Sequence, residues 1–313
     1  MTNSVEHHIT YGMVSNTLSW PGSKYCAVYC WNSWLRLFDL YRKAFIQEFS
    51  VHGSGGMSAA VSADDSHLYL ATYYSWGLAC VEIASRRFVW KRKDLKGFYG
   101  LSFSPQDNCL YAEFDRGSAI KVDAQTGKTI AKFPRVREVS ASPFGGYVLM
   151  GEPKHLCLRD TSGITLQKWP REGLKILNVG WSPHTIAIVE CEDLLTLQEK
   201  FGSRAYDLQR GSLLWRLPRK ETQPTGLLFR RENEYVGIEG TLGRTVVLRI
   251  DEYTGAIHRQ PIPVDGMRCK TCGRGSIGCS VCGHGSLIFA IELYTHETRV
   301  FQLGDYGQDI HEA

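Results

Sequence analysis

The chain has 313 residues, of which 43% are hydrophobic and 22% are charged. This is the composition of an ordinary globular protein, and it excludes a disordered or fibrous chain. Lysine and arginine total 36 against 32 aspartate and glutamate residues, so the net charge of +4 is too small to predict a chain coated by nucleic acid. Binding of an anionic partner would therefore depend on local clusters of basic residues.

The first eleven residues read MTNSVEHHITY and lack the charged-then-apolar pattern of a secretory signal. No later window has the roughly 18 uninterrupted apolar residues that a membrane helix needs. Six cysteines lie in alternating apolar stretches, where reduced thiols behave as small hydrophobic side chains: Cys26, Cys30, Cys80, Cys109, Cys157 and Cys191. We therefore expect a cytoplasmic protein with no membrane partner.

An apolar strand that ends in an acidic residue and a turn recurs along the chain. The acidic residues follow one another at intervals of 37 to 47 residues: Asp39, Glu82, Asp123, Asp160, Asp207 and Asp251. A second marker, a turn rich in Ser, Pro, Asp or Gly, keeps the same period and starts at Ser19, Ser62, Ser104, Ser142 and Ser182. Each unit holds three or four short alternating runs and no helical periodicity of useful length. Four strands in each repeat of about 40 residues predict the blades of a β-propeller.

The repeats predict seven blades, at residues 14–49, 57–93, 98–133, 138–169, 176–217, 225–261 and 264–303. The seventh has strands at SLIFAIEL and TRVFQL and is one strand short. The segment from His7 to Met13 belongs to no other blade, so we expect it to supply the missing outer strand. Pairing of the two ends of the chain would close the ring and hide sheet edges. The predicted fold is all-β: one domain over residues 1–313, a seven-bladed β-propeller closed by an N-terminal strand.

The repeats resemble those of known propeller families. Residues 123–133, DAQTGKTIAKF, and 205–217, AYDLQRGSLLWRL, are similar to the outer strands of quinoprotein-type repeats. Residues 101–114, LSFSPQDNCLYAEF, are similar to the inner strands of WD40 and YVTN repeats. The likeness extends over nearly the whole chain, and it implies the propeller architecture.

Aromatic residues concentrate in the connections between the second and third strands of the first two predicted blades. These residues are Trp31 and Trp34 in the first blade, and Tyr73, Tyr74 and Trp76 in the second. In this topology such connections lie on the same face as the links from one blade to the next. Tryptophan and tyrosine offer a large contact area for little lost freedom, so the residues predict a protein-recognition patch. The alternative is that the rings pack between blades.

Arginines preceded by proline recur in the blade-to-blade connections. They are Arg135, Arg171 and Arg219, with Lys91, Arg92 and Lys93 at the equivalent place in the second blade. On one face of a ring they would form a basic rim that favours an acidic partner. The alternative is that each arginine pairs with an acidic residue of the adjoining blade, such as Glu138, Glu172 or Glu221.

Residues 267–286, MRCKTCGRGSIGCSVCGHGS, contain a C-x2-C-x6-C-x2-C pattern. Two thiolates three positions apart can hold one metal ion, and two such pairs complete a tetrahedral zinc site. The predicted ligands are Cys269, Cys272, Cys279 and Cys282. We expect a zinc-knuckle insert in the last blade with one structural zinc ion. The alternative is a redox-active dithiol pair or two disulfides. The two units CKTCGRGS and CSVCGHGS also resemble the CxxCxGxG repeats of J-domain chaperones, which implies zinc binding and contact with client proteins.

The sequence has no G-x-S-x-G elbow, no H-E-x-x-H motif and no Walker loop, so it predicts no catalytic residues. The leading hypothesis is a non-catalytic propeller that binds another protein, of acidic character, through the loop face near the zinc module. Within that class an adaptor, an inhibitor of the immunity type and an assembly subunit stay open. The alternative is an enzyme (lyase, hydrolase or oxidoreductase) with a dispersed active site in the central channel. We do not expect a nucleic-acid partner.

Overall fold

The computed structural model describes residues 5–10, 14–19, 23–30, 34–39, 42, 44–50, 57–73, 77–114, 117–172, 174–193, 202–218, 224–231, 233–241, 244–261, 278–281, 287–292 and 297–303. These residues form seven antiparallel sheets of four strands each. The all-β fold of repeated sheets predicted from the 40-residue period is therefore present, and it is consistent with a β-propeller. The part of the chain described here contains no helix that could cross a membrane.

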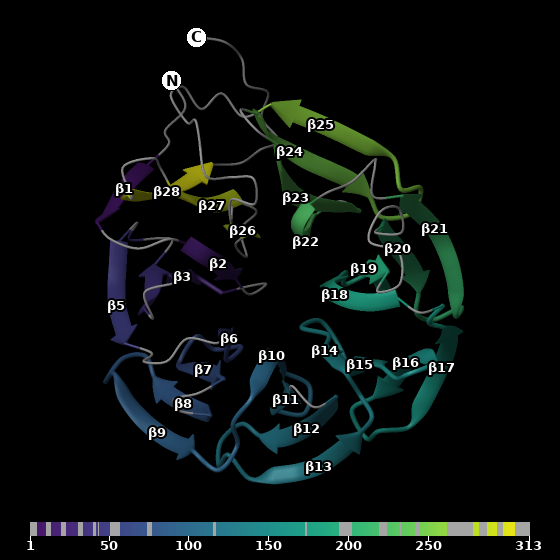
Figure 1. The fold of residues 1–313 in the computed structure, drawn as a ribbon, viewed down its shortest axis with the longest axis horizontal. Coiled ribbons are helices and arrows are strands. Elements are labelled where there is room, and N and C mark those ends of the chain that lie inside the picture. Colours follow the sequence, from purple (N-terminus) through teal and green to yellow (C-terminus); the bar gives the residue numbers. More distant parts are fainter. Residues whose placement is uncertain are drawn as a thin grey trace. The chain divides into compact units, whose positions relative to one another are not determined.

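The chain divides into two compact units, which we describe separately (Figure 1). Unit 1 comprises Met1–Ser50, Gln223–Asp251 and Ala256–Ala313. Its first sheet holds β2 (Val14–Ser19), β3 (Tyr25–Cys30), β4 (Trp34–Asp39) and β5 (Ala44–Ser50). Its second sheet holds β22 (Pro224–Arg231), β23 (Glu234–Thr241), β24 (Arg244–Asp251) and β25 (Ile257–Pro261). The third has the order β1 (Val5–Thr10), β28 (Glu297–Leu303), β27 (Leu287–Glu292) and β26 (Gly278–Val281).

The third sheet of unit 1 joins the two ends of the chain. Strand β1 pairs with β28 in an antiparallel register, with Val5 opposite Gln302 and Thr10 opposite Glu297. The N-terminal segment thus supplies the fourth strand, as the short last repeat predicts, but over Val5–Thr10 rather than from His7 to Met13. Closure of all sheets into one ring of seven blades, and the single domain, remain predictions.

Unit 2 comprises Val51–Thr222 and the turn Glu252–Gly255. Its first sheet holds β6 (Met57–Val61), β7 (His67–Thr72), β8 (Leu78–Glu82) and β9 (Arg87–Arg92). Its second sheet holds β10 (Phe98–Ser104), β11 (Cys109–Phe114), β12 (Ser118–Asp123) and β13 (Thr129–Pro134). Its third sheet holds β14 (Glu138–Ala141), β15 (Tyr147–Gly151), β16 (His155–Asp160) and β17 (Thr165–Pro170). Its fourth sheet holds β18 (Leu174–Trp181), β19 (Ile186–Asp193), β20 (Gly202–Asp207) and β21 (Ser212–Pro218). Each sheet follows chain order from its first strand to its fourth.

In three sheets of unit 2, the recurring acidic residue at the end of the third strand closes the turn to the fourth. Asp123 Oδ1 accepts hydrogen bonds from the backbone N–H of Thr126 at 2.7 Å and from the Thr126 hydroxyl at 2.8 Å. Asp160 Oδ1 accepts from the N–H of Ile164 at 2.9 Å, and Asp207 caps its own turn in the same way. These bonds favour the ionised carboxylate, so the pKa values of Asp123 and Asp160 lie below the usual range. The marker that reveals the repeat is thus a turn-forming residue.

The core of unit 2 lies between successive sheets. Middle strands such as β7 and β8 are buried almost throughout, whereas the fourth strands β9 and β13 alternate between exposed and half-buried residues. One apolar cluster joins the sheets β14–β17 and β18–β21 through Leu158, Trp169, Trp181 and Tyr206. The buried thiols of Cys80, Cys109 and Cys157 are unpaired small core side chains, as the sequence predicts for them, and burial raises their pKa values well above the usual range.

Tryptophans on three fourth strands link their sheets to the turn between the third and fourth strands of the next sheet. Their indole N–H groups donate to backbone carbonyls at 2.8 to 3.0 Å: Trp90 to Ala124, Trp169 to Gly211 and Trp215 to Glu252. At Gly127, with φ of +71°, an added Cβ would lie 2.8 Å from the Trp90 ring. Glycine is therefore required there both for the left-handed backbone and for the close approach of the indole.

Candidate functional site

The aromatic residues predicted to form a recognition patch are described only in part. Trp34 begins β4, and Tyr73 follows β7 as a half-buried residue. The carbonyl of Tyr73 accepts a hydrogen bond at 3.0 Å from the N–H of Gly97, in the connection after β9. Trp31, Tyr74 and Trp76 lie outside the described residues. The patch remains a prediction.

The predicted zinc site also lies largely outside the described residues. Cys279 is in β26, paired in register with Phe289, whereas Cys269, Cys272 and Cys282 are not described. Among the residues that are described, no three His, Cys, Asp or Glu side chains come together as a metal-binding group. The described residues therefore leave the four-cysteine site untested.

The three predicted rim arginines have different environments. Arg135 follows β13 with φ of +66° and is exposed, and Arg219 lies outside the described residues. Arg171 is buried, with 6% of its side chain exposed. Its Nη2 lies 2.6 Å from Glu138 Oε1, and its Nη1 donates to the carbonyl of Glu152 at 3.0 Å. At Arg171 the geometry favours the alternative, in which the arginine pairs with an acidic residue of an adjoining sheet.

The Glu138–Arg171 pair belongs to a larger group of charges, which we call the Glu113 cluster: Glu113, Glu138, Arg171 and Lys175. Glu113 lies near the end of β11, and its Oε1 accepts a hydrogen bond from the N–H of Val139 at 2.6 Å. Burial raises the pKa of Glu113 to about 7, opposed by the Val139 hydrogen bond and reinforced by the negative charge of Glu138. Burial also raises the pKa of Glu138, although Arg171 acts in the opposite direction. The cluster therefore holds a carboxyl group that titrates near neutral pH.

Two glycines make room for these carboxyl groups. An added Cβ at Gly100 would lie 2.5 Å from the Glu113 carboxyl carbon, and one at Gly151 would collide with Glu138 Oε2. Each carboxyl group thus packs directly against backbone. Glu113 bonds from its sheet to β14, and Glu138 bonds from β14 to the residue after β17. The cluster therefore connects adjacent strands and sheets through its hydrogen bonds.

Sequence reasoning missed Glu113. The residue sits in the run CLYAEF, which reads as a half-buried strand whose polar positions face solvent. The run itself has no feature that distinguishes this glutamate from one that faces solvent. The partners of Glu113 come from strands far along the chain, so the alternation within β11 carries no information about them.

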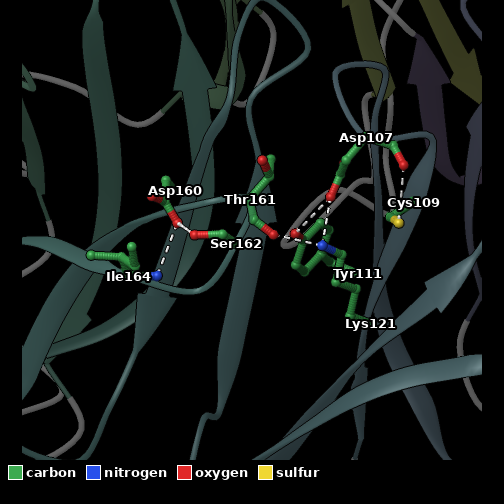
Figure 2. Close-up of polar contacts among 8 residues, drawn as sticks. All are labelled: Asp107, Cys109, Tyr111, Lys121, Asp160, Thr161, Ser162 and Ile164. Carbon is green, nitrogen blue, oxygen red and sulfur yellow. Dashed lines mark hydrogen bonds and ion pairs between the residues drawn. The ribbon is translucent and has the colours of Figure 1, made fainter.

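A second polar link joins the sheet β10–β13 to the turn after β16 (Figure 2). Lys121 Nζ lies 2.7 Å from Asp107 Oδ2 and donates to the carbonyl of Thr161 at 2.6 Å. Both ionised side chains are largely buried, with 13% and 18% exposed. The Tyr111 hydroxyl donates to Asp107 Oδ2 at 3.4 Å, and burial raises the pKa of this phenol above its ordinary value. The link holds two successive sheets of unit 2 together.

Comparison with known proteins supports the fold. Neither protein-family models nor curated protein sequences match this chain. Among solved structures, a chain of "Crystal Structure of Mitotic Checkpoint Complex" is similar over 97% of this chain and 96% of that chain, with a TM-score of 0.71 and 12% identity. At this identity the likeness shows the fold alone. Together with the repeated four-stranded sheets, it supports a WD40-like propeller.

Proposed function

We propose that this chain is a non-catalytic, seven-bladed propeller whose function is to bind another protein. The proposal is supported by the WD40-like likeness over nearly the whole chain and by the repeated sheets. The observation that carries it is this likeness, because the similar chain comes from a protein complex. The Glu113 cluster supports a non-catalytic role. Glu113 accepts a hydrogen bond from the Val139 N–H, and Glu138 accepts one from Arg171, so these groups bond to neighbouring segments of the scaffold. With these groups engaged in the scaffold, loops and outer strands are left for recognition.

The first surface we propose for binding is the aromatic patch of Trp31, Trp34, Tyr73, Tyr74 and Trp76. It is supported by the residue types, since aromatic anchors dominate the energy of protein interfaces. It is also supported by the hydrogen bond from Gly97 to Tyr73, which ties one of its loops to the connection after β9.

A double substitution tests this patch. The tagged chain and its Trp34→Ala/Trp76→Ala variant are used to capture partners from the native cell, and the partner found with the unchanged chain is then purified and titrated. We expect the variant to lose at least about tenfold in affinity. Phe144→Ala serves as the matched control, because Phe144 is an aromatic residue exposed on a different turn. Equal affinity of the double variant and the control would count against the patch.

We further propose that Cys269, Cys272, Cys279 and Cys282 hold one structural zinc ion beside β26. The chemistry of the donor set supports this, because four thiolates in two C-x2-C pairs match closed zinc sites. The position of Cys279 in β26 would couple the metal to the innermost strand of its sheet. Zinc would contribute to folding there, since a metal that binds only the folded chain stabilises it.

Metal analysis of the purified chain tests the zinc proposal. We expect about one zinc per chain, its loss in Cys272→Ser, and a lower melting temperature after chelation. Cys157→Ser is the matched control, because Cys157 is a buried free thiol outside the module. A chain that folds without zinc, and whose melting curve is unaffected by a chelator, would refute the proposal.

A further inference from the structure

Positive charge is concentrated on the fourth strands of the first two sheets in unit 2 and in the connections that flank these strands. Among the described residues from 82 to 135, eight lysine and arginine side chains are exposed, against two acidic ones, Glu82 and Asp94. We call these eight the β9–β13 basic surface: Arg86, Arg87, Lys91, Lys93, Lys96, Lys128, Lys132 and Arg135. The whole chain has a net charge of only +4, so the excess is local.

Three acidic residues of the same segment already have partners within the chain. Asp94 Oδ2 lies 2.7 Å from Arg92 Nη2, and Asp107 Oδ2 lies 2.7 Å from Lys121 Nζ. Asp123 caps its turn. Crowding among the cations has a visible effect at Lys91, whose pKa is lowered by burial and by the positive charge of Lys93. Exposed cations thus outnumber exposed acidic groups in this segment, and such an excess favours a negatively charged partner.

Two hydrogen bonds hold the parts of the surface together. Trp90 donates to the carbonyl of Ala124 at 3.0 Å, and Arg92 Nη1 donates to the carbonyl of Gly127 at 2.5 Å. These bonds fasten β9 to the turn that leads into β13 and carries Lys128. Within unit 2, β9 and β13 follow one another at the side away from β6 and β10 (Figure 1). The cations of β9 and Lys128 are therefore held on neighbouring segments.

The exposed residues alternate between cations and aliphatic side chains. On β9 the outward positions are Arg87, Val89 and Lys91, with 51% of Val89 exposed. On β13, Ile130 is 54% exposed and is followed outward by Lys132. Residues two apart on a strand are separated by about 7 Å, and an extended peptide has the same spacing. A peptide with acidic and apolar residues at alternate outward positions could therefore match the charges and the aliphatic groups together.

A protein segment fits these features better than a nucleic acid does. Phosphate groups would neutralise the cations but leave Val89 and Ile130 facing a charged backbone. Apolar side chains between carboxylates would cover both aliphatic residues and gain free energy by burying them.

We propose that the β9–β13 basic surface binds an extended acidic segment of a partner protein, in which acidic and apolar residues alternate on one face. This inference rests on the proposed protein-binding function and adds to it a second surface and the chemistry of the partner.

A labelled peptide of three Glu-Ser-Val-Ser repeats is the probe, titrated with the full chain by fluorescence anisotropy. We expect binding that weakens between about 0.05 M and about 0.5 M salt, because exposed ion pairs are screened. The variant Arg87→Glu/Lys128→Glu/Lys132→Glu should weaken it by about tenfold or more. The matched control is Lys154→Glu/Lys168→Glu/Arg210→Glu, which changes net charge equally at exposed positions outside the surface. This control should change affinity less than about twofold.

A second variant separates the partner classes. Val89→Ser/Ile130→Ser should weaken peptide binding by about threefold or more while leaving binding of a short DNA duplex unchanged. Equal losses in the two charge-reversal variants would overturn the proposal, since net charge alone would then explain them. Tighter binding of the duplex than of the peptide, with no effect of the serine variant, would replace the acidic segment by a nucleic acid. If the chain fails to bind the peptide but still captures its partner through Trp34 and Trp76, this inference fails and the proposed function stands.

Discussion

Replacing Glu113 by glutamine should make the stability of this protein less dependent on pH. The folded chain raises the pKa of Glu113 from its ordinary value of 4.5 to about 7, mainly because the carboxyl group is buried. Between these two pH values the folded chain holds a proton that the unfolded chain has released. The free energy of unfolding therefore falls as the pH rises through this window, and the loss is complete above pH 7.

The size of the change in the free energy of unfolding follows from the shift in the pKa of Glu113. At about 1.4 kcal/mol for each pKa unit, a rise from 4.5 to about 7 corresponds to about 3 kcal/mol. Glutamine has no such titration, and its Oε1 can still accept the hydrogen bond from the Val139 N–H. Relative to the unchanged chain, Glu113→Gln should be close to neutral at pH 4.5 and stabilising by about 3 kcal/mol at pH 8.

Urea unfolding at several pH values between 4.5 and 8, followed by tryptophan fluorescence, measures this difference. Comparing the two curves cancels the titration of histidines and other groups that both chains share. Glu172→Gln is the control, because Glu172 is exposed and its pKa is lowered by the hydrogen bond and charge of Arg204. Glu172 titrates below this pH range, so the free energy of unfolding of Glu172→Gln should depend on pH in the same way as that of the unchanged chain. If the free energy of unfolding of Glu113→Gln also changes with pH in the same way as that of the unchanged chain, the reasoning is refuted.

Two further substitutions test contacts between sheets. Arg171→Met removes the partner of a carboxylate that is only 12% exposed, so chemical unfolding should show a loss of about 3–5 kcal/mol, and adding Glu138→Gln should restore part of it. A double variant as unstable as the single one would show that the ion pair does not matter. Gly127→Ala combines φ of +71° with a Cβ placed 2.8 Å from the Trp90 ring, and should cost about 2–3 kcal/mol. Gly163→Ala, with φ of +95° and nothing within 4 Å, should cost only the backbone strain of about 1 kcal/mol, so equal losses would mean that the indole contact contributes nothing.

Strands and turns could be predicted from the residues because their causes are local. Asp123 bonds to Thr126 three positions later, and the alternating exposure of β9 follows from its period of two. The same local logic finds the repeat and locates the N-terminal strand to within a few residues. It also identifies Cys80, Cys109 and Cys157 as core residues, since each lies in an apolar alternating run.

Contacts between sheets could not be predicted from such local patterns. Arg135 and Arg171 stand in nearly identical settings, FPR and WPR, yet Arg135 is exposed and Arg171 is buried against Glu138. The difference comes from residues more than thirty positions away, and the desolvation that raises the pKa of Glu113 comes from strands that β11 meets only after folding. Local hydrogen bonds and side-chain periodicity are encoded within a few residues, whereas burial and ion pairing depend on which distant segments the packed sheets bring together.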